Sequence, residues 1–132
     1  MAEKRHQLRP SDERGQTLAE FAVMLPVLCL ILFGIIQFGV VFHDYLTVTD
    51  ASRVGARRAA VSRLVPDPAA AAETAARNSA GNLNVTAVCE ADDWDEAGSD
   101  VSCTVTYPYS IDVIGLDLVS GELTSVTTER LE

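Results

Sequence analysis

The sequence predicts an α+β protein in which a long N-terminal membrane-spanning helix precedes a small head with a short helix and an antiparallel β-sheet. Three observations predict this fold class. Residues 21–42 are apolar and uncharged, residues 65–68 (VPDP) interrupt a helical pattern, and from residue 84 onward apolar and polar residues alternate. With 132 residues, the chain has room for one modest domain after the apolar run.

The apolar run at 21–42 contains a single strongly polar residue, Gln37. At a rise of about 1.5 Å per residue the run spans roughly 33 Å, which matches the roughly 30 Å hydrocarbon core of a bilayer. A soluble fold of this size could hardly cover a helix that is apolar on every face. A cleaved secretory signal would have a shorter apolar region and a small-residue cleavage site after it, and residues 43–58 show none. We therefore expect a retained anchor.

The helical pattern extends beyond the membrane. It begins near Gln16 and continues to residue 63, whereas residues 1–14 are polar and predicted to be disordered. Small residues recur every four positions at Ala51, Gly55 and Ala59, and this spacing makes a smooth stripe that another helix or sheet can approach closely. The sequence leaves open whether the stripe packs on the protein's own head or on another subunit.

A second helix is predicted after the proline-rich break. Asp67 followed by Pro68 is a good N-cap and first-turn pair, and Gly81 is the expected stop.

Two strands follow, at residues 84–89 and 101–107, joined as an antiparallel hairpin by the acidic loop at 90–100. Pro108 is expected to end the second strand. Residues 123–131 are rich in β-branched side chains and are predicted to supply a third strand.

The head predicted for residues 64–132 is strongly acidic. It carries thirteen Asp and Glu residues against Arg77 and Arg130, and the whole chain has a net charge of −9. Because such a surface repels nucleic acid and anionic lipid headgroups, we expect neither to bind the head.

Orientation in the membrane follows from charges and cysteines together. Near the span, four Lys or Arg residues lie on the N-terminal side (positions 4, 5, 9 and 14) and four on the C-terminal side (positions 53, 57, 58 and 63), so the positive-inside rule is tied. Asp44 and Asp50 come first on the C-terminal side, which favours a cytoplasmic N-terminus. Cys89 and Cys103 lie on the same apolar strand faces and are predicted to form a disulfide, which an oxidising compartment outside the cytoplasm would allow. Cys29 lies within the span, out of their reach.

No combination of residues indicates catalysis, a metal site or a cofactor. His6 and His43 are far apart in the sequence and lack a partner pattern for metal binding or base catalysis. Residues 93–98 (DWDEAG) resemble the start of a calcium loop, but Ala97 and Thr104 occupy positions where ligands are expected. We expect neither an enzyme nor a bound metal or cofactor.

The strongest local motif lies where the polar leader meets the apolar run, at residues 14–21 (RGQTLAEF). A carboxylate at the start of an apolar helix is costly unless it stays in the interface or finds a cation. Cleavage of the Gly15–Gln16 bond would make Glu20 the fifth residue of the mature chain and Phe21 the sixth. This arrangement resembles the processing site of type IV pilin-like precursors, which a prepilin peptidase cuts after such a glycine. The alternative is an interfacial glutamate with an incidental glycine nearby.

The resemblance extends over residues 14–60, which look like the signature of TadE-like proteins, the pseudopilins of tight-adherence (Flp-type) pili. The C-terminal segment at 105–109 (VTYPY) also resembles that family, more weakly. The family-like positions are Arg14-Gly15-Gln16, Glu20-Phe21-Ala22, Leu25-Pro26, Gly34 and the run from Ala51 to Arg57.

The resemblance implies a pilin-like subunit, either a minor pilin or a component of pilus assembly. Residues 1–15 would be a cleaved cytoplasmic leader, residues 16–63 a long helix containing the span, and residues 64–132 an extracytoplasmic head. Glu20 would meet the amino terminus of a neighbouring subunit. The expected partners are the prepilin peptidase, other pilin or pseudopilin subunits, the assembly platform and membrane lipid.

Two other functions stay open at the level of sequence. One is an unprocessed single-pass protein of the cytoplasmic membrane that binds a partner or belongs to an envelope complex, and the other is a small secreted domain. The mass of the membrane-extracted protein separates these functions from the pilin-like one, because only the latter loses the leader and keeps the span.

Overall fold

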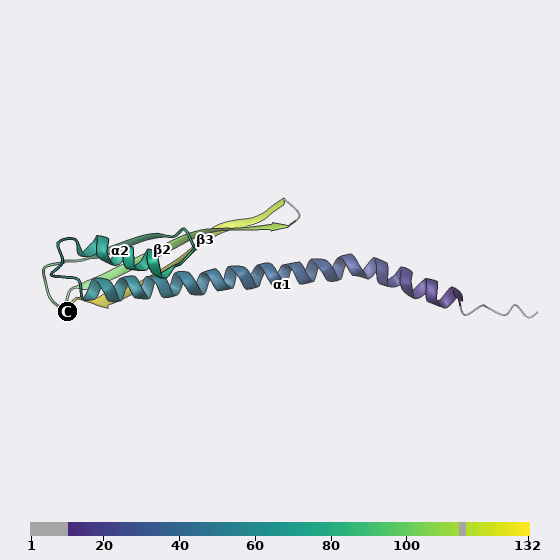
Figure 1. The fold of residues 1–132 in the computed structure, drawn as a ribbon, viewed down its shortest axis with the longest axis horizontal. Helices are drawn as coiled ribbons and strands as arrows, with labels where there is room; N and C mark the ends of the chain where they lie inside the picture. Colours follow the sequence, from purple (N-terminus) through teal and green to yellow (C-terminus); the bar gives the residue numbers. More distant parts are fainter. Residues whose placement is uncertain (1–10, 114–115) are drawn as a thin grey trace, which may run out of the picture. The chain divides into compact units, whose positions relative to one another are not determined.

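The computed structural model describes residues 11–113 and 116–132. It confirms the predicted α+β class, with a long apolar N-terminal helix, a short second helix and a three-stranded antiparallel sheet (Figure 1). The elements are α1 (Ser11–Ala60), α2 (Pro68–Ser79), β1 (Thr86–Ala91), β2 (Asp100–Val113) and β3 (Leu116–Arg130).

Helix α1 begins earlier than the sequence pattern predicted. It starts at Ser11 rather than near Gln16, so the expectation of disorder over residues 1–14 is wrong for 11–14, and residues 1–10 lie outside the described part. The physical reason is in the sequence, because Asp12 and Glu13 place negative charge in the first turn, where the helix dipole favours it.

The described chain divides into two units, with the boundary between residues 37 and 38. In the first, every described side chain from residue 15 to 36 is exposed. Helix α1 is long and apolar enough to cross a membrane, by its length and composition. It also continues through Pro26, a residue that apolar membrane helices tolerate more readily than soluble ones.

The sheet of the second unit has the order β1-β2-β3, and both neighbouring pairs are antiparallel. The prediction that Pro108 ends the second strand is wrong, because β2 continues to Val113 and pairs with β3 throughout. β1 pairs with β2 only as far as Thr106. At Pro108 the strand therefore has β3 on one side and no paired strand among the described residues on the other. Proline is tolerated on such an open edge.

The second helix agrees with its predicted signals. The Asp67 side chain accepts a hydrogen bond from the backbone N–H of Ala70 at 2.9 Å, as an N-cap residue does. Pro68 occupies the first turn. Gly81 follows the C-cap with a φ of 63°, a left-handed conformation that glycine adopts without strain.

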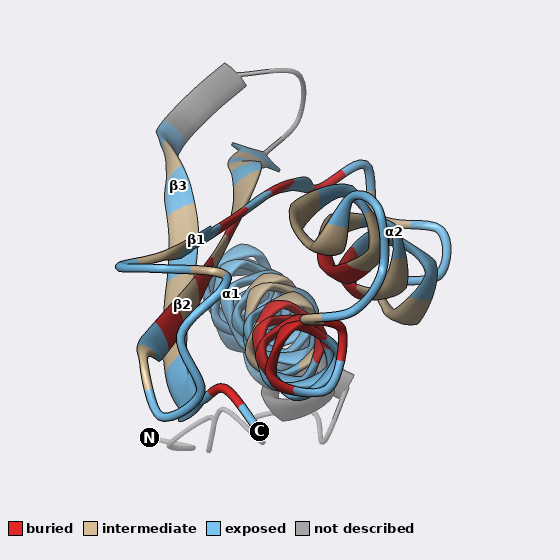
Figure 2. Ribbon diagram, turned by 90° about the vertical axis from the view of Figure 1, so that its left-hand side faces the viewer, coloured by how far each residue is buried: buried red, intermediate tan, exposed pale blue. Residues whose placement is uncertain are grey.

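The core of the head lies where α1, α2 and one face of the sheet meet (Figure 2). Small side chains dominate it, so the backbones lie close together. One cluster contains Ala56, Ala59, Ala60, Ala72, Cys89, Val101, Cys103 and Leu131. The other contains Val48, Ala51, Ala76, Ala80, Val85, Ala87 and Val105.

At Gly55, helix α1 lies close to both α2 and β2. A Cβ added to Gly55 would lie 3.0 Å from the Cβ of Ala76 in α2 and 3.1 Å from the Sγ of Cys103 in β2. Both distances are shorter than ordinary carbon contacts, so no side chain fits there without displacing a neighbour.

Gly55→Val should therefore lower the thermal unfolding temperature of the head, because overpacking of this kind destabilises a core by about 1–3 kcal/mol. Unfolding of the detergent-solubilised protein can be followed by the fluorescence of Trp94, which packs against the first cluster. Gly39→Val is the matched control, because nothing lies within 4 Å of a Cβ added there. Equal unfolding temperatures for the two variants would contradict the close approach.

Candidate functional site

The predicted processing motif lies in the first turns of α1. Gly15, Gln16 and Glu20 are exposed, and nothing lies within 4 Å of a Cβ added to Gly15. The bond between Gly15 and Gln16 is thus helical and unobstructed. Because glycine is a weak helix former and helix ends fray, this turn opens more readily than those that follow it.

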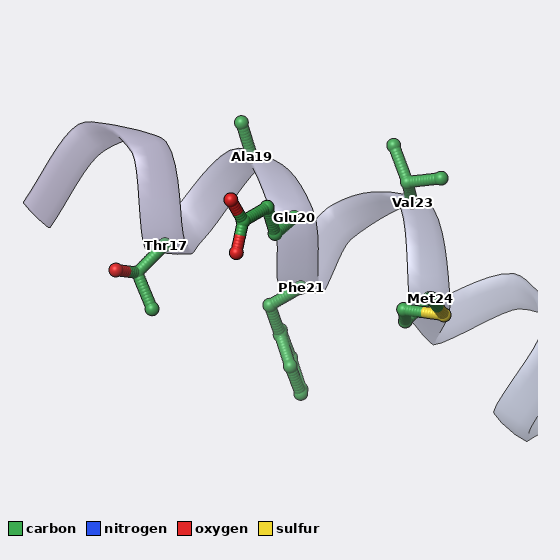
Figure 3. A pocket seen from close by; sticks show the side chains of 6 residues that line it. All are labelled: Thr17, Ala19, Glu20, Phe21, Val23 and Met24. Atoms are coloured by element: carbon green, nitrogen blue, oxygen red, sulfur yellow. The ribbon is translucent and has the colours of Figure 1, made fainter. Parts of the chain in front are cut away.

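Glu20 stands among apolar neighbours. Its Oε1 accepts a hydrogen bond from Nε2 of Gln16 at 3.1 Å, one helical turn away. Figure 3 shows its carboxylate between the side chains of Thr17 and Phe21 on one flank of the helix and Ala19 on the other. Phe21 is 59% exposed. None of the side chains that the structure describes forms an ion pair with Glu20.

The negative charge of Glu20 must be stabilised by its surroundings. In a membrane, a carboxylate at the start of an apolar helix needs water, a headgroup or a cation. The amide of Gln16 supplies one hydrogen bond but no positive charge. The geometry therefore leaves Glu20 able to accept a cationic partner from outside the described residues.

Comparison with known proteins bears on the same segment. Residues 15–57 match the model of the TadE-like protein family. Over these residues the chain is similar to TadE-like proteins. No match was found among curated proteins or among solved structures.

The TadE-like segment begins at the glycine of the processing motif and ends within the small-residue stripe. The structure places that stripe inside the head: Ala51 and Ala59 are fully buried, and Gly55 lies against α2 and β2. Of the two uses left open by the sequence, packing on the protein's own head is the one that the structure shows.

Ser52 is a packing residue whose role the sequence did not indicate. It is fully buried, and its hydroxyl lies 3.0 Å from that of Ser125 and 2.8 Å from that of Thr127, both in β3. The same hydroxyl donates to the carbonyl of Thr49 at 2.9 Å. Serines are common in helices and on strand faces, so only the tertiary arrangement shows that these polar groups satisfy one another.

The cysteines agree with the prediction. Cys89 and Cys103 form a disulfide between directly paired positions of β1 and β2, with a Cα–Cα distance of 4.1 Å. Both are buried, whereas Cys29 is a free and exposed cysteine in the apolar part of α1.

Hydrogen bonds within the acidic loop at 90–100 connect its own residues. Oδ1 of Asp93 accepts a hydrogen bond from the backbone N–H of Asp95 at 2.9 Å. The backbone N–H of Asp93 in turn donates to the hydroxyl oxygen of Ser99 at 3.0 Å. Within the described part of the chain, no group of three or more His, Cys, Asp or Glu residues is arranged to hold a metal ion.

Replacing the disulfide by Cys89→Ser/Cys103→Ser should destabilise the head by about 3 kcal/mol, because the cross-link closes a loop of about 15 residues in the unfolded chain. The loss is large for a small core built mainly of alanine and valine. Denaturant unfolding of the oxidised protein measures it. Cys29→Ser is the control, since that thiol is free. The disulfide would have no stabilising role if the double variant unfolded at the same midpoint as the control.

Proposed function

We propose that this protein is a pilin-like subunit, a pseudopilin, that takes part in the assembly or structure of a tight-adherence type IV pilus. The observation that carries the proposal is the TadE-like match over residues 15–57, which begins at the glycine of the processing motif. The long apolar helix is consistent with a protein of this kind. The proposed role is structural, and no catalytic residue is assigned.

In this proposal a prepilin peptidase removes residues 1–15 and leaves Gln16 as the new N-terminus. The exposed, uncrowded position of Gly15 supports access to the bond. Because the bond is part of α1, the peptidase must unwind the turn around it, and glycine at that position lowers the free energy needed.

In the processed protein the long helix runs from Gln16 to Ala60, because α1 ends at Ala60 and not at the predicted residue 63. The span at 21–42 lies in the cytoplasmic membrane, and residues 64–132 form the head outside. The disulfide between Cys89 and Cys103 supports this orientation, because disulfides persist in oxidising compartments. The partners are the prepilin peptidase, other pilin or pseudopilin subunits, the assembly platform and the lipid around the span.

Cleavage also creates the cation that Glu20 lacks. The new α-amino group of Gln16 lies near the same edge of the bilayer as the Glu20 carboxylate of an adjacent subunit. In a low-dielectric environment, attraction between these groups is stronger than between groups in water, and either charge alone is penalised. The pair therefore selects one axial register between neighbouring helices.

Processing should remove fifteen residues, as shown by intact-mass measurement and N-terminal sequencing after co-expression with a matching prepilin peptidase. Gly15→Ala should slow cleavage, because alanine stabilises the helix by about 1 kcal/mol relative to glycine. Gly34→Ala, which adds a methyl group at another uncrowded helical position, is the control. Recovery of only the full-length chain would favour an unprocessed membrane-anchored protein, and a start beyond residue 42 would indicate a secreted domain.

Glu20→Ala should leave processing largely intact and reduce incorporation into the pilus or its assembly complex. A pair contributing only about 1.4 kcal/mol changes incorporation tenfold. Glu20→Gln is the matched variant, because it keeps the shape and the hydrogen-bonding capacity toward Gln16 but removes the charge. Comparing the cleaved fraction with the assembled fraction for all three proteins separates the two steps.

Normal assembly of both variants would exclude the charge pair. A block in cleavage would instead identify Glu20 as a contact of the peptidase. If Glu20 is only an interfacial residue, Glu20→Ala should slightly favour membrane residence and change nothing else.

A further inference from the structure

Beyond the end of β1, strands β2 and β3 continue as a two-stranded ribbon (Figure 1). We call residues 107–113 and 116–123 the β2–β3 arm. Its described residues have no third strand beside them, because β1 pairs with β2 only as far as Thr106. An isolated two-stranded ribbon is marginally stable in water, so a long arm of this kind needs a surface to lie against.

The arm is amphipathic. The residues of one face pair across the strands as Tyr107 with Leu123, Tyr109 with Gly121 and Ile111 with Val119. The opposite face carries the exposed residues Pro108, Ser110, Ser120 and Glu122.

On the apolar face of the arm, a tyrosine ring fills the space beside Gly121. The Tyr109 ring covers Gly121, where an added Cβ would lie 3.0 Å from the ring carbon Cε1. Toward the tip the face changes from aromatic to aliphatic, and Val119 is 51% exposed. Tyrosines beside aliphatic side chains are the composition that proteins place at the boundary between water and lipid.

The apolar face of the arm continues the face of the sheet that packs on α1. Val101 shares a cluster with Ala59 and Ala60, whereas Val105 shares one with Val48. Strand β2 therefore runs antiparallel to α1, and the arm continues toward the membrane end of the helix.

The rise per residue in strands and helices shows how far along α1 the arm extends. Tyr107 packs against the cluster that contains Val48. From Tyr107 to Ile111 the strand advances roughly 13 Å, which equals about nine helical residues. Ile111 and its partner Val119 are thus roughly level with Gly39, just inside the end of the predicted span at residue 42.

The helix itself supports this path. Val41 and Asp44, which lie two turns and one turn before Val48 on the same side of α1, are half-buried, whereas Val40 and Phe42 are exposed. The covered side of α1 therefore extends from the core of the head to the edge of the predicted span.

We propose that the end of the β2–β3 arm, at Ile111 and Val119, lies in the interfacial layer of the outer leaflet and contacts lipid there. This inference rests on the proposed anchoring of α1 in the membrane. The ligand is the glycerol and upper acyl-chain region of a zwitterionic phospholipid, because the acidic head repels anionic headgroups. The polar face with Ser110 and Ser120 stays toward water, and the arm braces the head against the bilayer surface.

Lipid-quenched tryptophan fluorescence tests the contact in the full chain. The native tryptophan is first removed by Trp94→Phe, and the protein is placed in phosphatidylcholine nanodiscs whose acyl chains carry bromine near the interface. Val119→Trp should be quenched several-fold more strongly than Val126→Trp. Position 126 is the matched control, because it holds an exposed valine in the same strand, about 23 Å farther from the membrane. A third variant, Phe33→Trp, reports on the anchor itself.

Strong quenching of Val119→Trp with little quenching of Val126→Trp supports the inference. Equal, weak quenching of these two variants alongside strong quenching of Phe33→Trp overturns it and leaves the anchoring intact. Absence of quenching in all three contradicts the anchoring as well. The Val119→Trp spectrum could instead be insensitive to brominated lipid but differ between nanodiscs that hold one protein and nanodiscs that hold two. That result assigns the arm to a second copy of the chain and also overturns the lipid contact.

Discussion

At Gly55, helix α1, helix α2 and strand β2 come within van der Waals contact of one another, and this close approach sets the dimensions of the head. Alanines line the rest of the contact, and the disulfide between Cys89 and Cys103 lies directly against it. A core of small side chains buries little apolar area per residue, so its stability depends on dense packing and on the cross-link. The hydroxyl of Ser52 adds hydrogen bonds to β3 at the same level.

The same helix meets two different environments. Between residues 15 and 36 it is apolar and exposed on all sides, as suits a lipid environment, whereas from residue 48 to 60 it presents one small-residue face to the sheet and a polar face to water. The covered side reaches to Val41, near the edge of the span. In the proposed function, Glu20 and the small-residue stripe that packs on the head belong to the same helix, α1.

Several features were predicted from the sequence because local patterns determine them. The apolar run, the Asp67 cap and the alternation around Cys89 each depend on residues close together in the chain. The start of α1 at Ser11 could have been found from its first-turn acids. The extension of β2 past Pro108 could not have been predicted in this way. It depends on where β1 stops, and β1 is remote from Pro108 in sequence.

Sequence patterns alone predict the membrane-compatible helix, the α+β class, the pairing of Cys89 with Cys103 and the motif around Gly15 and Glu20. All of these follow from composition, periodicity or short spacing. Three other features are seen only in the folded head: the small-residue stripe packs on the protein's own head, Ser52 bonds to β3, and the β2–β3 arm extends beyond β1. The stripe and Ser52 contact residues that are 21 to 75 positions away in the chain, such as Ala76 for Gly55 and Thr127 for Ser52. Which of many similar small or polar residues will meet is set by the packing of the whole head.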